Sequence, residues 1–167
     1  PSKKSTKGTE EFLAAFEALR SMGLQFGVKL LQGIPYEDMP WEYASADIFC
    51  NSLYYSGRSV FEAMNAGCAV ADYGTEHAEK LFSRHALATM RLLGFQDGKD
   101  DLTTLWRRHN DIDAITHMPI ETVRSGNVAE KLARLILDFP HRQELAQKGP
   151  EYVRAWLSPK KRCQEIL

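Results

Sequence analysis

The hydrophobic positions of the first 71 residues alternate between helix-like and strand-like patterns. After the acidic pair Glu10 and Glu11, apolar residues recur at three- and four-residue intervals, which predicts a helix that ends at Gly23. Strands and helices are then expected in turn, as strand 26–31, helix 36–46, strand 47–50, helix 59–66 and strand 68–71. This order predicts a fold built from strand–helix–strand units.

The predicted strands are short and apolar throughout, without a polar face. That is typical of parallel strands covered on both sides by helices. We therefore expect an α/β fold, with an open, Rossmann-like, mostly parallel sheet flanked by helices. A central strand should precede the first helix in such a sheet, yet residues 1–8 read as a polar loop. We expect the chain to be a fragment whose first central strand lies upstream of Pro1.

The second half of the chain has a weaker pattern until its end. We expect helical pieces at 75–93, a loop at 94–101, a short helix at 102–108 and an edge strand at 114–116. Asn127 should cap a helix over 128–138, with Leu132, Leu135 and Ile136 on one face. Pro140 should begin a helix that extends to Leu157. Ser158-Pro159 should begin a final short helix.

Composition narrows the class of protein. The 167 residues suit one domain, 1–167, and 44% hydrophobic with 26% charged residues is typical of a folded globular chain. Lys and Arg number 21 against 22 Asp and Glu, which argues against bulk electrostatic binding of nucleic acid. The sequence has no apolar run long enough for a membrane span, and we expect no secretory signal. Three widely spaced cysteines indicate reduced thiols in a cytoplasmic protein, and we expect no metal site.

Three loops should meet at the carboxyl ends of the strands, where open parallel sheets bind ligands. They span 2–8, 33–35 and 51–59, and they offer cations and free backbone N–H groups that suit a phosphate or diphosphate. Simpler interpretations stay open. A lysine-rich start is often only solvated, Gly57-Arg58-Ser59 suits a turn and cap, and Glu62 suits a helix dipole. Neither Gly-x-Gly-x-x-Gly nor a P-loop occurs.

Three stretches of the sequence, taken in order along the chain, resemble a known protein family. They are Lys7-Gly8-Thr9, then Ala-Ser-Ala-Asp-Ile-Phe-Cys-Asn-Ser at 44–52, and Ser-Val-Phe-Glu-Ala-Met-Asn-Ala-Gly-Cys-Ala-Val-Ala at 59–71. Together they resemble the C-terminal, donor-binding domain of GT-B-fold glycosyltransferases of the large group 1 family. The likeness covers most of 7–82 and 119–167, and we expect an insertion at 83–118.

The resemblance implies a role for each matching residue. Lys7 would neutralise the diphosphate of a nucleotide sugar, and Glu62 would bind its ribose. Backbone N–H groups around the start of the helix would hold the diphosphate, with candidates Gly57, Arg58, Ser59 and Val60. The loop containing Gly33 and Pro35 would lie near the base.

The sequence departs from the family pattern at two positions. Tyr54 stands where the family has the glutamate that contacts the donor sugar, and Ser2 stands where it tends to carry an arginine. Lys3 or Lys4 would supply the missing charge, though without the guanidinium fork.

The resemblance implies sugar transfer from a nucleotide-diphosphate donor to a hydroxyl acceptor, with no further cofactor. The acceptor would be bound by a missing N-terminal domain, so we expect the fragment to be inactive alone. The main alternative is a degenerate, non-catalytic module that binds or scaffolds, and a related GT-B epimerase is a second.

Overall fold

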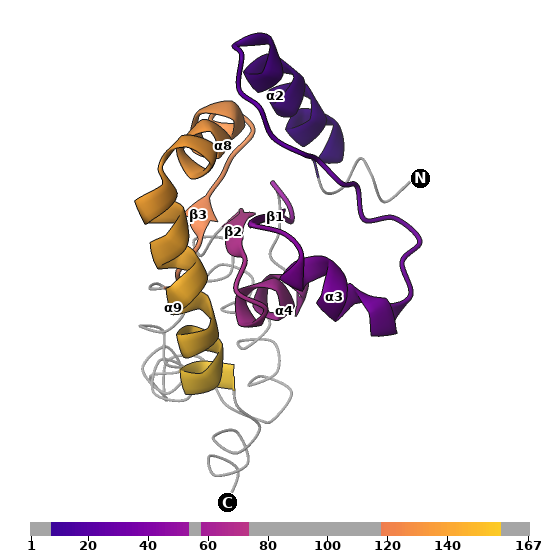
Figure 1. Cartoon of the computed structure of the whole chain (residues 1–167), viewed down its shortest axis with the longest axis vertical. Helices are drawn as coiled ribbons and strands as arrows, with labels where there is room; N and C mark the ends of the chain where they lie inside the picture. The colour runs from indigo at the N-terminus through magenta and orange to yellow at the C-terminus, as the bar shows by residue number, and fades with distance from the viewer. Residues whose placement is uncertain (1–7, 54–57, 74–117, 158–167) are drawn as a thin grey trace, which may run out of the picture.

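The structure, a computed structural model, describes residues 8–53, 58–73 and 118–157. These residues form an α/β fold around an open, three-stranded parallel sheet in the order β1-β2-β3, consistent with a Rossmann-like fold (Figure 1). The strands are β1 (Ile48–Cys50), β2 (Ala69–Asp72) and β3 (Glu121–Thr122). All four residues of β2 are buried, as the apolar run predicts for a central strand. The expectation of an open parallel sheet is confirmed.

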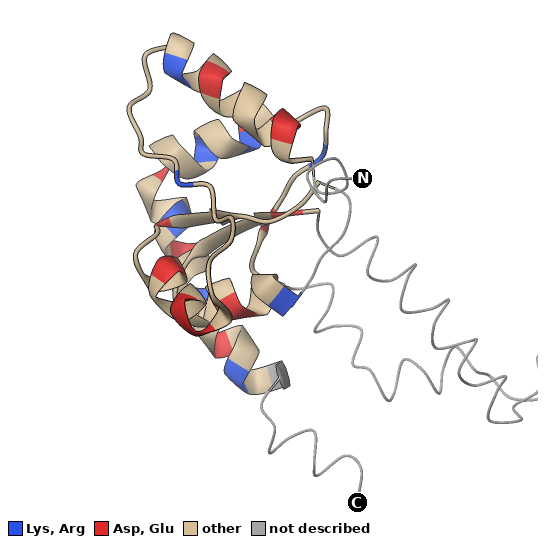
Figure 2. Ribbon diagram, turned by 90° about the vertical axis from the view of Figure 1, so that its right-hand side faces the viewer, with Lys and Arg blue, Asp and Glu red and all other residues tan. Residues whose placement is uncertain are grey.

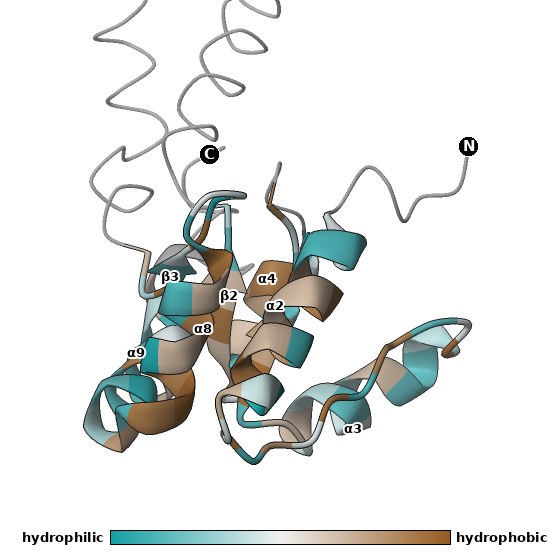
Figure 3. Cartoon of the chain, turned by 90° about the horizontal axis from the view of Figure 1, so that it is seen from above, coloured by the Kyte–Doolittle hydropathy of each residue, from teal (hydrophilic) through white to brown (hydrophobic). Residues whose placement is uncertain are grey.

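One face of the sheet carries α2 (Thr9–Ser21) and α8 (Val128–Leu137), which pack against each other (Figure 3). Ala69 and Ala71 of β2 point into this layer. The buried side chains of this face form the first cluster, which comprises Phe12, Ala15, Leu19, Leu53, Ala69, Ala71, Val123, Val128, Leu132, Leu135 and Leu145. The spacing of the helix residues in this cluster is the periodicity that predicted the two helices.

The opposite face carries a 3₁₀ turn, η1 (Tyr36–Asp38), with α3 (Met39–Ala44) and α4 (Arg58–Asn65). Val70 of β2 points into this layer. Its buried side chains form the second cluster, which comprises Tyr43, Val60, Ala63, Met64, Cys68, Val70 and Met118. Since alternate residues of β2 point to opposite faces, one short strand contributes to both clusters.

Two helices end where glycine was expected to end them. Gly23 has φ +91° and donates to the Arg20 carbonyl, while the Leu24 N–H donates to the Leu19 carbonyl. Gly67 has φ +86° and begins the same pair of bonds after α4. Both ends are Schellman motifs, in which a left-handed residue turns the chain back over the last helical carbonyls.

The prediction of a strand at 26–31 is wrong. Within the described part of the chain, this segment has no regular structure and pairs with none of the three strands, and a strand needs such a partner to form. The single helix expected over 36–46 is instead η1 followed by α3, with Pro40 in the first turn of α3. Two of the apolar residues in this periodic pattern, Leu13 of α2 and Met22 just after it, are exposed.

The C-terminal helices match the prediction closely, with one difference in capping. Asn127 precedes α8 as expected, but its side chain makes no cap and instead accepts from the Arg124 N–H at 2.7 Å. A two-residue edge strand, β3, follows Pro119 and was not predicted. The predictions at 75–93, 94–101, 102–108, 114–116 and 158–159 lie outside the described residues, as does the insertion expected at 83–118 except for its last residue.

Helix α9 (Phe139–Leu157) serves both faces of the sheet. Leu145 near its start belongs to the first cluster, whereas Tyr152 and Val153 pack against the second. Among the described helices, none is long and apolar enough to cross a membrane. Acidic and basic side chains are interspersed along the helices, in keeping with the near-zero net charge (Figure 2).

We expect Gly149→Ala to destabilise the protein by about 1–2 kcal/mol, since overpacking a close contact costs about 1–3 kcal/mol. A Cβ at Gly149 would lie 2.9 Å from the Met64 carbonyl oxygen of α4, which belongs to backbone and cannot rotate away. The same substitution at an exposed helix position gains about 1 kcal/mol of helix propensity. Urea unfolding measures the effect, with Gln147→Ala at an exposed neighbouring position as the control. A stabilised G149A variant would contradict the tight α4–α9 approach.

Candidate functional site

The carboxyl edge of the sheet collects the starts of three helices. Helix α4 follows β1 along the chain and α8 follows β3, while α2 begins beside Leu53, a residue shortly after β1. A Cβ placed on Gly8, just before α2, would lie 2.8 Å from the Leu53 side chain. Helix N-termini present free N–H groups and a partial positive charge, so this edge suits an anion. Two of the three predicted loops, 2–8 and 51–59, approach this edge through their described residues.

A chain of buried polar side chains lies at this edge. The Asn51 amide donates to the Asp72 carboxylate at 2.7 Å, and the Ser59 hydroxyl donates to the Asn51 amide oxygen at 2.9 Å. Asn51 and Asp72 each come at the end of a strand, and Ser59 lies in the first turn of α4. These bonds fix the start of α4 against the ends of β1 and β2.

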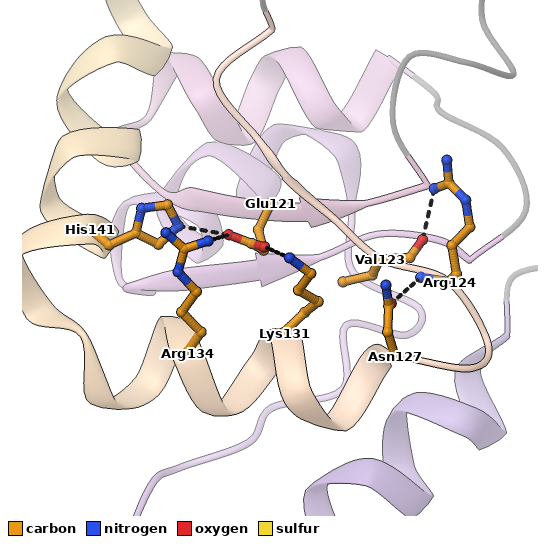
Figure 4. A network of polar contacts seen from close by, with 7 residues as sticks. All are labelled: Glu121, Val123, Arg124, Asn127, Lys131, Arg134 and His141. Atoms are coloured by element: carbon orange, nitrogen blue, oxygen red, sulfur yellow. Dashed lines mark hydrogen bonds and ion pairs between the residues drawn. The ribbon is translucent and has the colours of Figure 1, made fainter.

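A cation lies where β3 ends. The Arg124 guanidinium donates to the Val123 carbonyl (Figure 4). It also lies 4.1 Å from the centre of the Tyr73 ring and donates to the Tyr73 carbonyl. Tyr73 follows β2, so this stack joins the ends of two neighbouring strands. Asp72 and Arg124 thus place one acidic and one basic group at the same edge.

On the outer side of α4, four side chains form a polar cluster. The Tyr36 hydroxyl donates to the Glu62 carboxylate at 3.0 Å, and the Tyr43 hydroxyl lies 3.5 Å from its other oxygen. The Arg58 guanidinium lies 3.4 Å from Glu62 and 5.8 Å from the centre of the Tyr36 ring. Arg58 is 81% exposed and Glu62 27% exposed, so both remain accessible to solvent.

This cluster brings together the loop at 33–35 and the start of α4. Tyr36 follows Pro35 directly, so its bond to Glu62 holds that loop beside α4. Burial, the charge of Glu62 and the hydrogen bond to Glu62 raise the pKa of Tyr43 to about 12. Tyr43 is therefore a neutral hydrogen-bond donor at physiological pH.

The predicted site residues divide into three groups. Arg58 and Glu62 belong to the polar cluster, and Gly33 and Pro35 shortly precede its Tyr36 along the chain. Ser59 is described, but its hydroxyl donates a hydrogen bond to Asn51. The side chain of Val60 is buried in the second cluster. The remaining predictions lie outside the described residues, namely Lys3, Lys4, Lys7, Tyr54 and Gly57.

The described cysteines are structural. Burial raises the pKa of the Cys50 thiol to about 12, and burial with the nearby Asp47 charge raises that of Cys68 to about 11. The Cys68 Sγ lies 2.9 Å from the Tyr43 carbonyl oxygen. Both thiols therefore stay protonated and poorly nucleophilic near neutral pH. Within residues 8–53, 58–73 and 118–157, no group of three His, Cys, Asp or Glu residues could hold a metal ion.

Comparison of the chain with protein-family models, with curated proteins and with solved structures finds no match. The arrangement of the chain's own residues therefore carries the functional argument.

Sequence reasoning missed several residues that shape this edge. Asn51 and Asp72 are polar residues placed directly at the ends of buried strands, and that position was a usable signal. Tyr36 and Tyr43 gave no such signal, because an aromatic residue near a short helix is usually part of a core. Arg124 follows a strand too short for the hydrophobic pattern to reveal.

Proposed function

We propose that this chain is the donor-binding domain of a glycosyltransferase and holds a nucleotide-diphosphate sugar at the carboxyl edge of its sheet. The observation that carries the proposal is the position of Arg58. It is the first residue of α4, is mostly exposed, and stands one turn from Glu62 and beside Tyr36 of η1. A cation, a helix N-terminus and a carboxylate in this order match the parts of a nucleoside diphosphate.

The proposed reaction breaks one bond and forms one bond at the sugar. The bond between the sugar's anomeric carbon and the diphosphate oxygen breaks, and a bond to the acceptor oxygen forms as the acceptor hydroxyl passes its proton to a base, which the acceptor domain would supply. Negative charge grows on the leaving diphosphate. Arg58 and the backbone N–H groups at the start of α4 stabilise that charge. The basic residues Lys3, Lys4 and Lys7 add to this stabilisation.

Glu62 has a separate role in the proposal. A carboxylate accepts two hydrogen bonds well from a pair of ribose hydroxyls. Tyr36 and Tyr43 hold the Glu62 carboxylate in place from the side of α3. The exposed Tyr36 ring offers a surface for a base, and the adjoining loop at 33–35 would close around it.

We expect the chain to bind nucleoside diphosphates weakly and Arg58→Ala to weaken that binding by about tenfold, because losing one charge-assisted bond costs about 1.5–3 kcal/mol. Titration calorimetry with UDP, GDP and ADP measures the effect. Lys7→Ala and Glu62→Ala should weaken binding as well. Arg154→Ala removes an exposed arginine of α9, far along the chain from the cluster, and serves as the control.

Two outcomes count against the proposal. Unchanged affinity in the Arg58, Lys7 and Glu62 variants would show that the ligand binds elsewhere. No response to any of the three nucleotides would favour the alternative of a non-catalytic module, which keeps the fold without the ligand.

A further inference from the structure

Three hydrogen-bonded side chains connect the end of β2 to the start of α4. The Asn51 amide nitrogen lies 2.7 Å from the Asp72 carboxylate, and the Ser59 hydroxyl lies 2.9 Å from the Asn51 amide oxygen. Asp72 is fully buried and Asn51 is 7% exposed, whereas Ser59 is partly exposed in the first turn of α4. One end of this network is therefore fixed inside the protein, and the other end can meet a ligand.

The buried carboxylate sets the direction of both hydrogen bonds. A carboxylate only accepts, so the part of the Asn51 side chain that faces Asp72 must be its NH₂ group. Turning the amide over would bring its oxygen against a carboxylate oxygen with no proton between them. The Asn51 oxygen consequently faces Ser59, and because an amide oxygen carries no proton, the Ser59 hydroxyl must donate.

This direction determines what Ser59 can offer to a ligand. A serine hydroxyl has one proton and two lone pairs, and the proton of Ser59 is committed to Asn51. An ionised phosphate oxygen is also an acceptor, so it could bind Ser59 only if the hydroxyl turned away from Asn51. That turn would take from the buried Asn51 oxygen the donor that it has in the structure, which lowers affinity by about fivefold or more. A ligand hydroxyl can donate to Ser59 without this cost.

The position of Ser59 indicates which part of a nucleotide sugar faces it. In such a molecule the diphosphate lies between the ribose and the sugar. Glu62, the proposed ribose ligand, lies on the outer side of α4, whereas Ser59 turns toward the end of β1. Ser59 and Asn51 also line a cavity of about 840 Å³ whose lining is mostly apolar. Such a lining suits an uncharged sugar ring better than a charged diphosphate.

We propose that Ser59 is a specificity-determining residue for the donor sugar and that Asp72 is a positioning residue that acts on it through Asn51. Asp72 keeps the Ser59 hydroxyl turned inward, so Ser59 accepts a hydrogen bond from a sugar hydroxyl and has no proton for a phosphate oxygen. The diphosphate is held by Arg58 and the backbone N–H groups at the start of α4. This inference rests on the proposed function for its ligand, whereas the direction of the hydrogen bonds does not.

The first test compares ligands that differ only by the sugar. Titration calorimetry at pH 8 measures the affinity of residues 1–167 for UDP and UDP-glucose, for GDP and GDP-mannose, and for ADP and ADP-glucose. In the pair that binds most tightly, Ser59→Ala should weaken binding of the nucleotide sugar about fivefold more than binding of its diphosphate, because one hydrogen bond is lost. An equal or greater loss for the diphosphate would overturn the proposal while leaving the proposed function intact. Ser21→Ala, which removes an exposed hydroxyl at the end of α2, is the matched control and should change neither affinity.

Asp72→Asn separates positioning from packing. An amide at position 72 can donate as well as accept, so Asn51 can turn over at little cost and release the Ser59 proton to a phosphate oxygen. In the Asp72→Asn chain, Ser59→Ala should therefore weaken diphosphate binding about fivefold more than it does in the native chain. Independent effects of the two substitutions would contradict the role of Asp72. The comparison of each nucleotide sugar with its diphosphate needs only Ser59→Ala, so it decides the role of Ser59 even if Asp72→Asn does not fold.

NMR spectra of the ligand-free chain test the direction of the hydrogen bonds separately. Because the Asn51 NH₂ group donates to Asp72, Asp72→Asn should shift the signals of this group more than Ser59→Ala does. The reverse order would overturn the proposal, since the amide would then face the other way. If none of the six nucleotides binds, the proposed function and the sugar contact of Ser59 both fall, and the spectra still decide whether Asp72 orients Asn51.

Discussion

We expect Gly8→Ala to lower the free energy of unfolding by about 3 kcal/mol, through two costs that act together. Gly8 has φ +75°, a left-handed conformation that costs an L-residue about 1–2 kcal/mol. Its new Cβ would also lie 2.8 Å from the buried Leu53 side chain, and such overpacking costs about 1–3 kcal/mol. Urea unfolding followed by circular dichroism measures the change.

Gly23→Ala is the matched control for Gly8→Ala. Gly23 has φ +91°, but a Cβ added there would meet no atom within 4 Å, so only the backbone cost applies, about 1 kcal/mol. Leu53→Ala removes the two nearest atoms and leaves the Cβ of residue 53 at 3.0 Å, so Gly8→Ala should cost less in that background than in the native one. Equal costs for the two glycine variants in the native background would contradict the close approach of α2 to the end of β1.

Glu121→Gln is expected to cost about 3 kcal/mol at pH 7, because it removes the buried carboxylate that three partly exposed basic side chains share. The side chain of Glu121 is 5% exposed. Its carboxylate lies 2.9 Å from Lys131 Nζ, 2.6 Å from His141 Nε2 and 3.7 Å from Arg134 (Figure 4). These contacts join β3 to α8 and α9, so the loss falls on three elements at once.

The same cluster makes stability depend on pH in a defined direction. Burial alone raises the pKa of a carboxyl, but hydrogen bonds from Lys131 and His141, with the charges of Lys131 and Arg134, hold the pKa of Glu121 below its ordinary value of 4.5. A carboxyl with a depressed pKa in the folded state contributes stability above its unfolded pKa and loses it as the pH falls. The difference between wild type and E121Q should therefore be full at pH 7 and shrink below about pH 4.5.

Glu144→Gln is the control for this pH series. Glu144 is exposed and pairs with Lys148 one turn along α9, and exposed pairs of this kind contribute little. Its removal should leave the unfolding midpoint nearly unchanged at pH 7. A Glu121 variant that behaves like the Glu144 variant across the series would show that the buried cluster is energetically neutral.

Helices and strands of this fold were predictable where all the residues that indicate the element lie within one short segment. The helix at 9–21 carries acidic residues at its start, an apolar stripe and a terminal glycine, and its bounds agree with the prediction within two residues. Gly67 ends α4 for the same local reason. Strand 26–31 failed because a strand depends on a partner edge elsewhere, and β3 was missed because two residues, one of them buried through ion pairs, make no hydrophobic pattern.

The candidate site was predictable only in part. Topology places the ends of parallel strands together, so the loop positions could be inferred from the order of elements. Whether Glu62 would face solvent or neighbouring side chains depends on how α3 lies against α4, which no sequence spacing encodes. The Tyr36 and Tyr43 contacts to Glu62 span 26 and 19 positions along the chain.

Helix α9 closes both hydrophobic layers with one continuous element, since its first half covers the Leu145 side and its second half packs on Val70's side. Detaching that helix would expose buried side chains on both faces of the sheet to water at the same time. We therefore expect the two layers to open together, so that unfolding is cooperative across the whole sheet.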